Sequence, residues 1–290
     1  MIRIGIIGTE NTHALAFAKF FNLPDAQTGK VPYENIRVVA VMGDSESTAE
    51  IVTQTGVEFV AEKAEDLVGR VDAVMITSRK GSVHKEYAMP FVKLGLPLFV
   101  DKPFTSDPAE AEDLIAQIQA HNCPVAGGSA CKHLPHIQQI KKLVAELREK
   151  DEFISASMSF RVQMDSPYDG LYFYAPHLVE MCLEVFGPEV KAVNAVRKGE
   201  NMQVAVQYEK EAVSLHFVVS GKPGCLVYGK FENHHFDIDT APLFPTEATR
   251  FAKLLLGEET SLTAQQLTKP VHMIAAIQKS LDTGKTVFMA

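Results

Sequence analysis

The chain has 290 residues, of which 46% are hydrophobic and 22% are charged, a composition that is typical of folded globular proteins and excludes disordered and fibrous classes. Asp and Glu outnumber Lys and Arg by 36 to 28, for a formal charge of -8, which argues against a nucleic-acid partner. No apolar run reaches the ~20 residues of a membrane span, and the start has no signal-peptide organisation. We therefore expect a cytoplasmic protein with no nucleic-acid or membrane partner.

The cysteines and histidines do not indicate a metal site or a disulfide framework. The four cysteines lie far apart without CxxC spacing, which favours reduced and mostly buried thiols. His133 and His136 have a usable spacing, but Pro135 disturbs helical geometry between them and no third ligand is evident. We expect no bound metal.

The first half of the chain alternates buried strands with helices. Apolar runs without period-2 alternation are typical of strands buried on both faces, and they occupy 2–7, 36–42, 71–77, 96–100 and 123–127. Segments with helical signals lie between them, at 12–22, 44–56, 81–95 and 107–121. This order predicts an α/β domain at 1–125 with a doubly wound parallel (Rossmann) sheet, the fold that binds dinucleotides.

The second half has a different pattern, after a predicted bridging helix at 135–150. Partial alternation predicts strands at 152–163, 190–198, 201–209, 212–220 and 224–232. Helices are expected at 174–187, 245–257 and 264–284, with Pro270 kinking or dividing the last of them. We predict an α+β domain at 126–290, built on a large open, mainly antiparallel sheet, for substrate binding and oligomerisation.

The exposed face of that second sheet is expected to mediate a homo-oligomer. Its strands carry apolar side chains such as Phe217 and Val219 without an obvious helix to cover them. A substrate or water could also meet this face.

The turn after the first strand is a candidate dinucleotide-binding site. Gly8 fits the first glycine of G-x-G-x-x-G, whereas Glu10 and His13 replace the second and third. A helix N-terminus with free N–H groups would hold the pyrophosphate, next to Glu10, Asn11 and Thr12. The alternative is an ordinary strand–turn–helix with Asn11 or Thr12 as the N-cap.

Polar residues also follow the next strands. Asp44, after the second strand, could accept hydrogen bonds from the ribose hydroxyls and disfavour a 2′-phosphate, or could simply cap the next helix. Thr77, Ser78, Arg79 and His84 follow a later strand, at the sheet edge where ligands of such folds bind. Arg79 could equally belong to a solvated loop.

Asp101-Lys102-Pro103 follows the strand at 96–100 and is the most informative tripeptide. A lysine that is desolvated at the mouth of a cleft loses its proton more easily, so it can exchange protons with a substrate. The alternative is that Lys-Pro here only makes a turn.

Taken in order, these motifs resemble the Gfo/Idh/MocA family of NAD(P)-dependent oxidoreductases over essentially the whole chain. The resemblance is carried by Gly8, by 77–84, by 101–103, by 128–135, by 177–187 and by the ending Ser280, Gly284 and Val287. It implies NAD or NADP in the first domain, a sugar, polyol or related alcohol against the second, and hydride transfer between them.

The resemblance also implies roles for individual residues. Lys102 matches the general acid/base lysine of the family's E-K-P motif, and His177 matches a histidine that orients the substrate or exchanges a proton with it. Lys132, Tyr174 and Glu180 would contact the substrate, while Phe173 stands where the family has an aspartate. The implied cofactor-binding residues are Gly8, Glu10, Asn11, Thr12, Asp44, Thr77, Ser78, Arg79, His84, Asp101 and Lys102.

Two functions remain open at this point. Lys102, His177 and the 77–84 segment favour an oxidoreductase acting on CH–OH groups. Glu10 and Phe173 favour a non-catalytic protein on the same scaffold, which binds a sugar-like ligand or regulates a partner with weak or lost dinucleotide binding.

Overall fold

The computed structural model describes residues 1–289. The chain divides into two units, the first made of 1–128 and 244–267 and the second of 129–243 and 268–290. Within the described residues, no helix combines the length and the hydrophobicity needed to cross a membrane.

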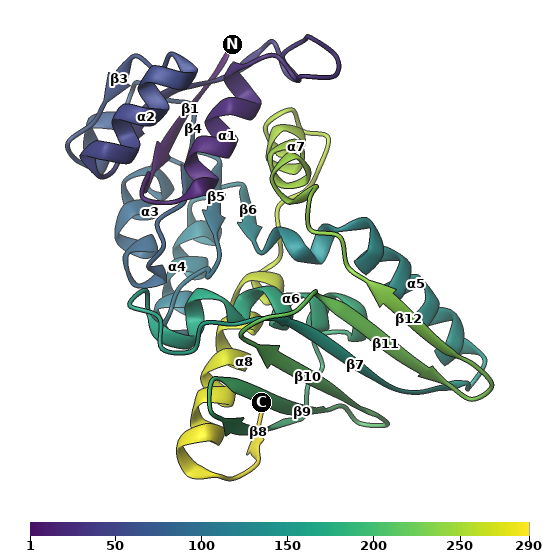
Figure 1. The fold of residues 1–290 in the computed structure, drawn as a ribbon. Coiled ribbons are helices and arrows are strands. Elements are labelled where there is room, and N and C mark those ends of the chain that lie inside the picture. Colours follow the sequence, from purple (N-terminus) through teal and green to yellow (C-terminus); the bar gives the residue numbers. More distant parts are fainter. Residues whose placement is uncertain (290) are drawn as a thin grey trace. The chain divides into compact units, whose positions relative to one another are not determined.

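The first unit contains a six-stranded sheet in the order β3-β2-β1-β4-β5-β6, and every strand pair in it is parallel. Five of its strands were predicted; the two-residue β3 was not, because two residues carry no periodicity. The strands are β1 (Ile2–Ile7), β2 (Ile36–Met42), β3 (Phe59–Val60), β4 (Ala73–Ile76), β5 (Leu98–Asp101) and β6 (Val125–Gly128) (Figure 1). The order reverses beside β1, and in this fold ligands bind at the carboxyl ends of the strands at such a reversal, here β1 and β4.

Helices alternate with these strands, and their starts follow the capping signals in the sequence. They are α1 (Thr12–Asn22), α2 (Ser45–Thr55), α3 (His84–Val92) and α4 (Pro108–Ala120). Asp107 accepts a hydrogen bond from the Glu110 N–H and Pro108 is the first residue of α4. Gly56 ends α2 with φ 69°, a left-handed conformation that glycine adopts without strain.

One helix of the first unit comes from far along the chain. The sequence predicted a single boundary at 125, but α7 (Leu243–Leu255) packs Ala248, Phe251 and Ala252 into the same core as β1 and α1. Phe251 lies edge-on to Phe99 of β5, with ring centroids 5.7 Å apart. An amphipathic pattern shows that a helix has a buried face, but not which sheet that face covers.

The second unit contains a seven-stranded sheet in the order β12-β11-β7-β10-β9-β8-β13. Its strands are β7 (Phe153–Arg161), β8 (Ala192–Lys198), β9 (Asn201–Gln207), β10 (Ala212–Val218), β11 (Gly224–Gly229), β12 (Asn233–Asp237) and β13 (Val287–Phe288). The pairing is antiparallel except between β7 and β10, which run parallel. The predicted open, mainly antiparallel sheet is therefore present, with β12 at the strand-like segment of His234 and His235 and a two-residue strand, β13, that the sequence did not indicate.

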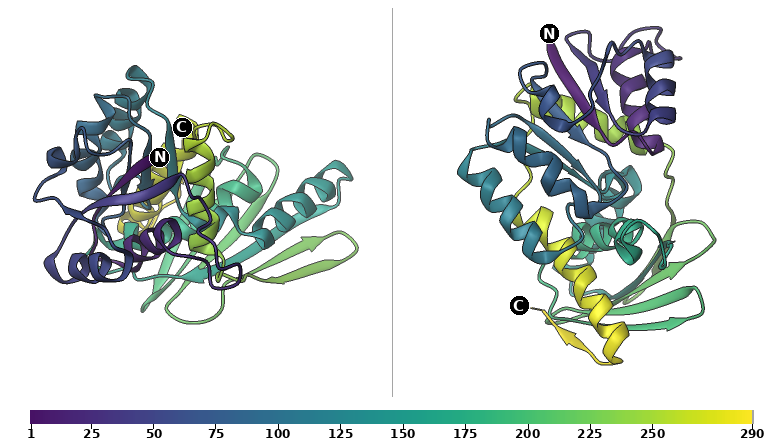
Figure 2. Two further views of the ribbon diagram at one scale, coloured as in Figure 1. Left: turned by 90° about the horizontal axis from the view of Figure 1, so that it is seen from above. Right: turned by 90° about the vertical axis from the view of Figure 1, so that its left-hand side faces the viewer.

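Helices cover one face of this second sheet (Figures 1 and 2). They are α5 (Pro135–Glu149), α6 (Ala175–Phe186) and α8 (Ala264–Thr283), and short 3₁₀ turns lie at Ala130–His133 and Gly170–Phe173. Phe217 is fully buried beneath them, so placing it on the exposed face was wrong: the alternation along β10 was recognised, but its two faces were exchanged. Pro270 does not divide α8, which runs through it.

The cysteines are free and buried, as predicted. Burial raises the pKa of the Cys123, Cys182 and Cys225 thiols to about 12, so these thiols stay protonated and are poor nucleophiles.

Candidate active site

The turn after β1 is built around Gly8. Its φ is +92°, and a Cβ at this position would lie 2.3 Å from the backbone nitrogen of Ser78. The turn therefore approaches the segment that follows β4 more closely than any side chain allows. Thr77 fixes the same approach by donating its hydroxyl hydrogen to the Gly8 carbonyl at 2.7 Å.

Asn11 is the N-cap of α1. Its side-chain oxygen accepts hydrogen bonds from the His13 N–H at 2.7 Å and the Ala14 N–H at 3.2 Å. Its side-chain amide donates to the Thr77 carbonyl. The capping alternative for Asn11 is thus present in the structure, and the cap also ties α1 to the segment after β4.

Glu10 is hydrogen-bonded to the segment after β4. Its Oε1 accepts a hydrogen bond from the Arg79 backbone N–H at 2.9 Å. Glu10 stands at the second glycine position of the fingerprint, where a carboxylate would repel a diphosphate. Because the carboxylate is bound at Arg79, it does not take up the N–H groups that begin α1.

Asp44 lies after β2 as the N-cap of α2. Its Oδ1 accepts hydrogen bonds from the Ser47 N–H at 3.0 Å and the Glu46 N–H at 3.1 Å, and the hydrogen bonds from Ser47 and Glu46 hold the pKa of the Asp44 carboxyl below its usual value. Its other oxygen, Oδ2, is directed to neither of these N–H groups. Asp44 therefore acts as a cap and keeps a negative charge at this edge of the sheet.

These features fit a dinucleotide. The glycine-dependent approach at Gly8, the backbone at the start of α1 and the acid after β2 stand where the fold holds pyrophosphate and ribose. The hydrogen bond from the Arg79 N–H gives the Glu10 carboxylate a fixed partner, which reduces its conflict with a diphosphate.

Lys102 follows β5 and is 7% exposed. Its backbone N–H donates to Asp101 Oδ1 at 2.7 Å, while Asp101 Oδ2 lies 2.7 Å from His13 Nδ1. Burial of Asp101 raises the pKa of its carboxyl, but His13, the Lys102 ammonium and the Lys102 N–H together hold that pKa below its usual value. A carboxylate with a partner on each oxygen thus stands beside the candidate catalytic lysine.

His84 joins the two segments that flank the site. Its ring is fully buried, with Nδ1 2.8 Å from the Pro103 carbonyl and Nε2 2.8 Å from the Ser78 carbonyl. Gly81 allows this packing, since a Cβ there would lie 2.4 Å from Pro103 Cγ. His84 therefore connects the Ser78 turn to the Lys102–Pro103 turn. Because both ring nitrogens contact these carbonyls, His84 does not present a ring nitrogen to a ligand.

In the second unit, His177 lies in the first turn of α6. Its Nδ1 is 2.7 Å from the hydroxyl of Ser129 and 3.4 Å from the Cys131 sulfur. The rings of Phe160 and Tyr174 lie against it, with centroids 5.2 and 5.8 Å away. These contacts fix the orientation of the imidazole ring.

Glu180 lies one turn further along α6 and is almost fully buried. Its Oε2 accepts hydrogen bonds from the Lys132 ammonium at 2.7 Å and the Ser129 N–H at 2.9 Å. Lys132 is buried as well. This pair holds the turn at Ala130–His133 against α6, and it is costly to break because either charge alone would remain buried without its partner.

The predicted site residues therefore form one cluster in each unit. The first joins the turn after β1, the segment after β4 and the Asp101–Lys102 turn; the second joins Lys132, His177 and Glu180. Lys102 belongs to the first unit and His177 to the second, so their expected approach to one ligand stays a prediction.

Two contributors were not singled out from the sequence. His13 was read only as a missing glycine, although it is the partner of Asp101. Ser129 was not assigned a role, although it contacts both His177 and Glu180. A serine that follows a predicted strand gives no sequence signal distinct from that of any turn.

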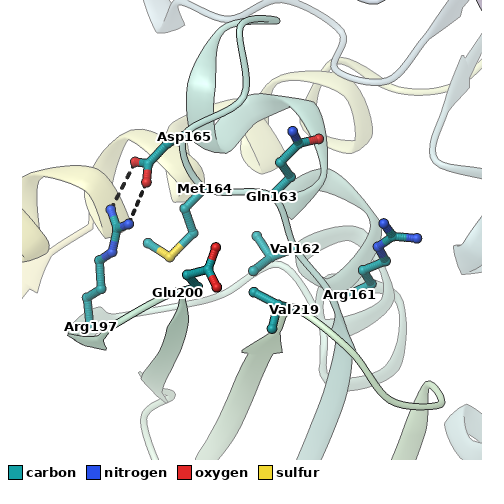
Figure 3. A pocket seen from close by; sticks show the side chains of 8 residues that line it. All are labelled: Arg161, Val162, Gln163, Met164, Asp165, Arg197, Glu200 and Val219. Atoms are coloured by element: carbon teal, nitrogen blue, oxygen red, sulfur yellow. Dashed lines mark hydrogen bonds and ion pairs between the residues drawn. The ribbon is translucent and has the colours of Figure 1, made fainter.

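A hollow of about 350 Å³ lies elsewhere in the second unit, at one end of its sheet (Figure 3). Asp165 and Arg197 form an ion pair across one side of it, with nitrogen–oxygen distances of 3.0 and 2.5 Å. The others that line it are Arg161, Val162, Gln163, Met164, Glu200 and Val219. It contains none of the predicted site residues.

Within residues 1–289, no three metal-binding side chains gather closely enough to hold an ion. The parallel sheet and the first cluster together have the arrangement of a Rossmann-type dinucleotide-binding domain.

Comparison with known proteins supports the dinucleotide-binding scaffold of the first unit. Residues 2–129 match the family model described as "Oxidoreductase family, NAD-binding Rossmann fold" of the Gfo/Idh/MocA type. This match concerns the Rossmann domain and covers less than half of the chain. It is also 23% identical over 210 residues to Oxidoreductase P35 of Formosa agariphila, and this match spans 65% of the chain and 64% of that protein's length.

Solved structures share the whole fold. The TM-score is 0.83 to GenD2 from gentamicin A biosynthesis in complex with NAD, at 15% identity over 100% of this chain and 96% of that one. It is also 0.83 to myo-inositol 2-dehydrogenase from Lactobacillus plantarum, at 15% identity over 100% and 99%. Scyllo-inositol dehydrogenase from Lactobacillus casei, with bound NAD(H) and scyllo-inositol, has a TM-score of 0.82 at 16% identity over 99% of both chains. At such identities the likeness concerns the fold.

Proposed function

We propose that the protein is an NAD(P)-dependent oxidoreductase that transfers a hydride between the nicotinamide and a CH–OH carbon of a sugar, polyol or related alcohol. One observation carries the proposal. A nearly buried lysine, Lys102, follows a strand at the ligand-binding edge of an NAD-type Rossmann sheet, next to a buried carboxylate that is already engaged by other partners.

Lys102 is the proposed proton carrier. Bound nicotinamide supplies or accepts the hydride. As hydride leaves the carbon, the hydroxyl must lose its proton, and an amine held at fixed geometry takes it. Burial makes the charged ammonium less favourable than in water, which eases this exchange near neutral pH.

His177 is the proposed orienting group for the substrate hydroxyl. Its Nδ1 lies 2.7 Å from the Ser129 hydroxyl and 3.4 Å from the Cys131 sulfur, contacts that fix the ring for an interaction with the substrate. Tyr174 lies beside its ring. Lys132 and Glu180 bind each other, so their proposed contribution to substrate binding is to hold the Ser129 segment. The proposal requires His177 and Lys102 to reach one ligand.

The cofactor is proposed to sit on the backbone of Gly8, Asn11 and Thr12, with its adenine ribose at Asp44. The negative charge of Asp44 and the adjacent Glu46 favour NAD over NADP, because a 2′-phosphate would meet two carboxylates at the start of α2.

The proposed substrate class, a polyhydroxylated alcohol, is supported by the solved inositol dehydrogenases of the same fold. Calorimetric titration with NAD(H) and NADP(H), followed by a nicotinamide absorbance assay over inositols, sugars and sugar acids, tests both parts of the proposal. Lys102→Met should abolish turnover and leave NAD binding within a few fold, whereas His121→Gln, on the exposed end of α4, should change neither. If no dinucleotide binds at millimolar concentration, the oxidoreductase proposal fails and a non-catalytic binding or regulatory role replaces it.

A homo-oligomer through the second sheet is part of the proposal. The face of that sheet opposite its helices presents small and mixed side chains on adjacent strands, namely Ser157, Ser214, Leu226 and Tyr228. Such a face suits close packing of a second copy. Light scattering should give a mass above one chain at micromolar concentration; a monomer would contradict this part.

A further inference from the structure

Two positions at which the sequence differs from the motifs it resembles lie next to each other in the structure. One is the third glycine of the fingerprint, and the other is the glutamate of E-K-P. His13 replaces the glycine and Asp101 replaces the glutamate, and their side chains lie 2.7 Å apart, from Nδ1 to Oδ2. Asp101 is 2% exposed. The shorter acid and the added imidazole thus form one unit that neither substitution explains alone.

This pair links two parts of the site. His13 lies in the first turn of α1, where its backbone N–H is held by the Asn11 cap, and a helix N-terminus is where a dinucleotide phosphate is held. Asp101 precedes Lys102, binds its backbone N–H and is close enough for its charge to interact with the ammonium. A change in the charge of His13 therefore changes how strongly Asp101 stabilises the Lys102 ammonium.

We propose that His13 is a positioning residue that couples binding of the dinucleotide to the proton on Lys102 through Asp101. This inference rests on the proposed function, since it needs the cofactor at α1. The bound pyrophosphate adds negative charge beside His13, so the imidazole takes up a proton. The imidazolium then neutralises the Asp101 carboxylate, and Lys102 loses the charge that stabilised its ammonium. Cofactor binding thereby prepares Lys102 to accept a proton.

Few other titratable groups surround the pair. Phe17 of α1 and Phe244 of α7 lie edge-on to the His13 ring, with centroids 6.2 and 4.9 Å away, so those elements present apolar rings. From α3, buried His84 interacts electrostatically with Asp101 and Lys102. In the turn itself, Glu10 is bound at Arg79.

The test is the number of protons taken up when NAD binds, measured by calorimetry of the whole protein in buffers of low and high ionisation enthalpy. The wild type should take up a fraction of a proton, up to one, when NAD binds. His13→Gln keeps an amide donor and removes the charge, so it should bind NAD without proton uptake. His121→Gln is the matched control and should behave as the wild type.

A second variant tests the coupling in case His13→Gln does not fold. Asp101→Asn removes the carboxylate that the imidazolium neutralises, and it should reduce the proton uptake. Acetic-anhydride labelling followed by mass spectrometry gives a readout at Lys102 itself: NAD should move the pH midpoint of Lys102 labelling downward in the wild type and leave it unchanged in His13→Gln.

The outcomes are distinct. If the wild type binds NAD without proton uptake, or if His13→Gln takes up as many protons as the wild type, the coupling is overturned while the proposed function stands. If NAD does not bind, both fall. If uptake and labelling shift as expected but no alcohol is oxidised, the coupling holds and the oxidoreductase assignment fails.

Discussion

The Glu10 carboxylate accepts a 2.9 Å hydrogen bond from the backbone N–H of Arg79, and through it the turn after β1 is bonded to the segment after β4. This contact holds the Glu10 carboxylate, which by its charge is unfavourable next to a diphosphate. It provides the negative charge with a fixed donor in the segment after β4. The charge is still close to the proposed pyrophosphate position, so it should weaken binding without abolishing it.

Replacing Glu10 should therefore separate charge from geometry. Glu10→Gln removes the charge and retains an oxygen that can accept the Arg79 N–H, so NAD should bind about tenfold more tightly, equivalent to about 1.4 kcal/mol. Glu10→Gly also restores the fingerprint glycine, but it frees the Arg79 N–H. Calorimetry at one ionic strength measures both. Unchanged or weaker binding in Glu10→Gln would mean that the carboxylate does not face the phosphates.

Gly8 should tolerate no side chain. Gly8→Val places a branched Cβ 2.3 Å from the Ser78 backbone nitrogen and at a positive φ. Loss of NAD binding is expected together with a lower melting temperature, because the contact is structural. A variant that folds and binds as the wild type would contradict the close approach of these two turns.

Asp44 should determine the choice between dinucleotides. Asp44→Ser keeps a side chain that caps α2 and removes the charge, so NADP binding should improve relative to NAD by about tenfold at little cost in stability. Asp44→Ala removes the cap as well, and should lower the free energy of unfolding by about 1 kcal/mol. The ratio of the NADP and NAD dissociation constants is compared between Asp44→Ser and Asp44→Ala. This comparison separates the role of Asp44 in binding from its role in capping.

Ser129 should act through His177. Ser129→Ala leaves His177 Nδ1 without the hydroxyl at 2.7 Å, so the ring can adopt either tautomer and more than one orientation. We expect kcat to fall by about 10-fold or more with KM changed less, and the pH–rate profile to shift. If Ser129→Ala lowers the melting temperature along with kcat and leaves the pH–rate profile unchanged, Ser129 only supports the fold.

The order of strands and helices in the first unit followed from local signals. The runs at 2–7 and 36–42 are uninterrupted and apolar because both faces of a central parallel strand are buried, and caps at Asp44 and Asp107 are set by residues beside the helix they begin. Such signals are contained in neighbouring residues, so the sequence displays them.

The remaining features depend on contacts between distant residues. His13 and Asp101 are 88 positions apart, and neither residue type by itself predicts the other. Phe217 shows the same difficulty within one strand: alternation along β10 was visible, but which face packs against α6 is fixed by the fold of the whole unit. The return of α7 to the first sheet likewise depends on where its apolar side finds a partner.

His84 should make stability depend on pH. Burial lowers the pKa of its imidazole in the folded protein, and the two carbonyl oxygens and Asp101 oppose this only in part. The unfolded chain then takes up the proton first as the pH falls below about 6.5, so the free energy of unfolding should decrease toward acid, by at most about 1.4 kcal/mol per pH unit from this group. Above that pH the contribution is constant, because both states are neutral.

His84→Gln lacks the titration and should show a shallower decline between pH 7 and 5 in urea unfolding. Its stability at pH 7 should be lower, because one of the 2.8 Å contacts is lost. The His121→Gln control, on the exposed end of α4, should follow the wild type. A steeper decline in His84→Gln than in the wild type would mean that the carbonyls of Ser78 and Pro103 outweigh burial and that the ring is held as an imidazolium donating to both.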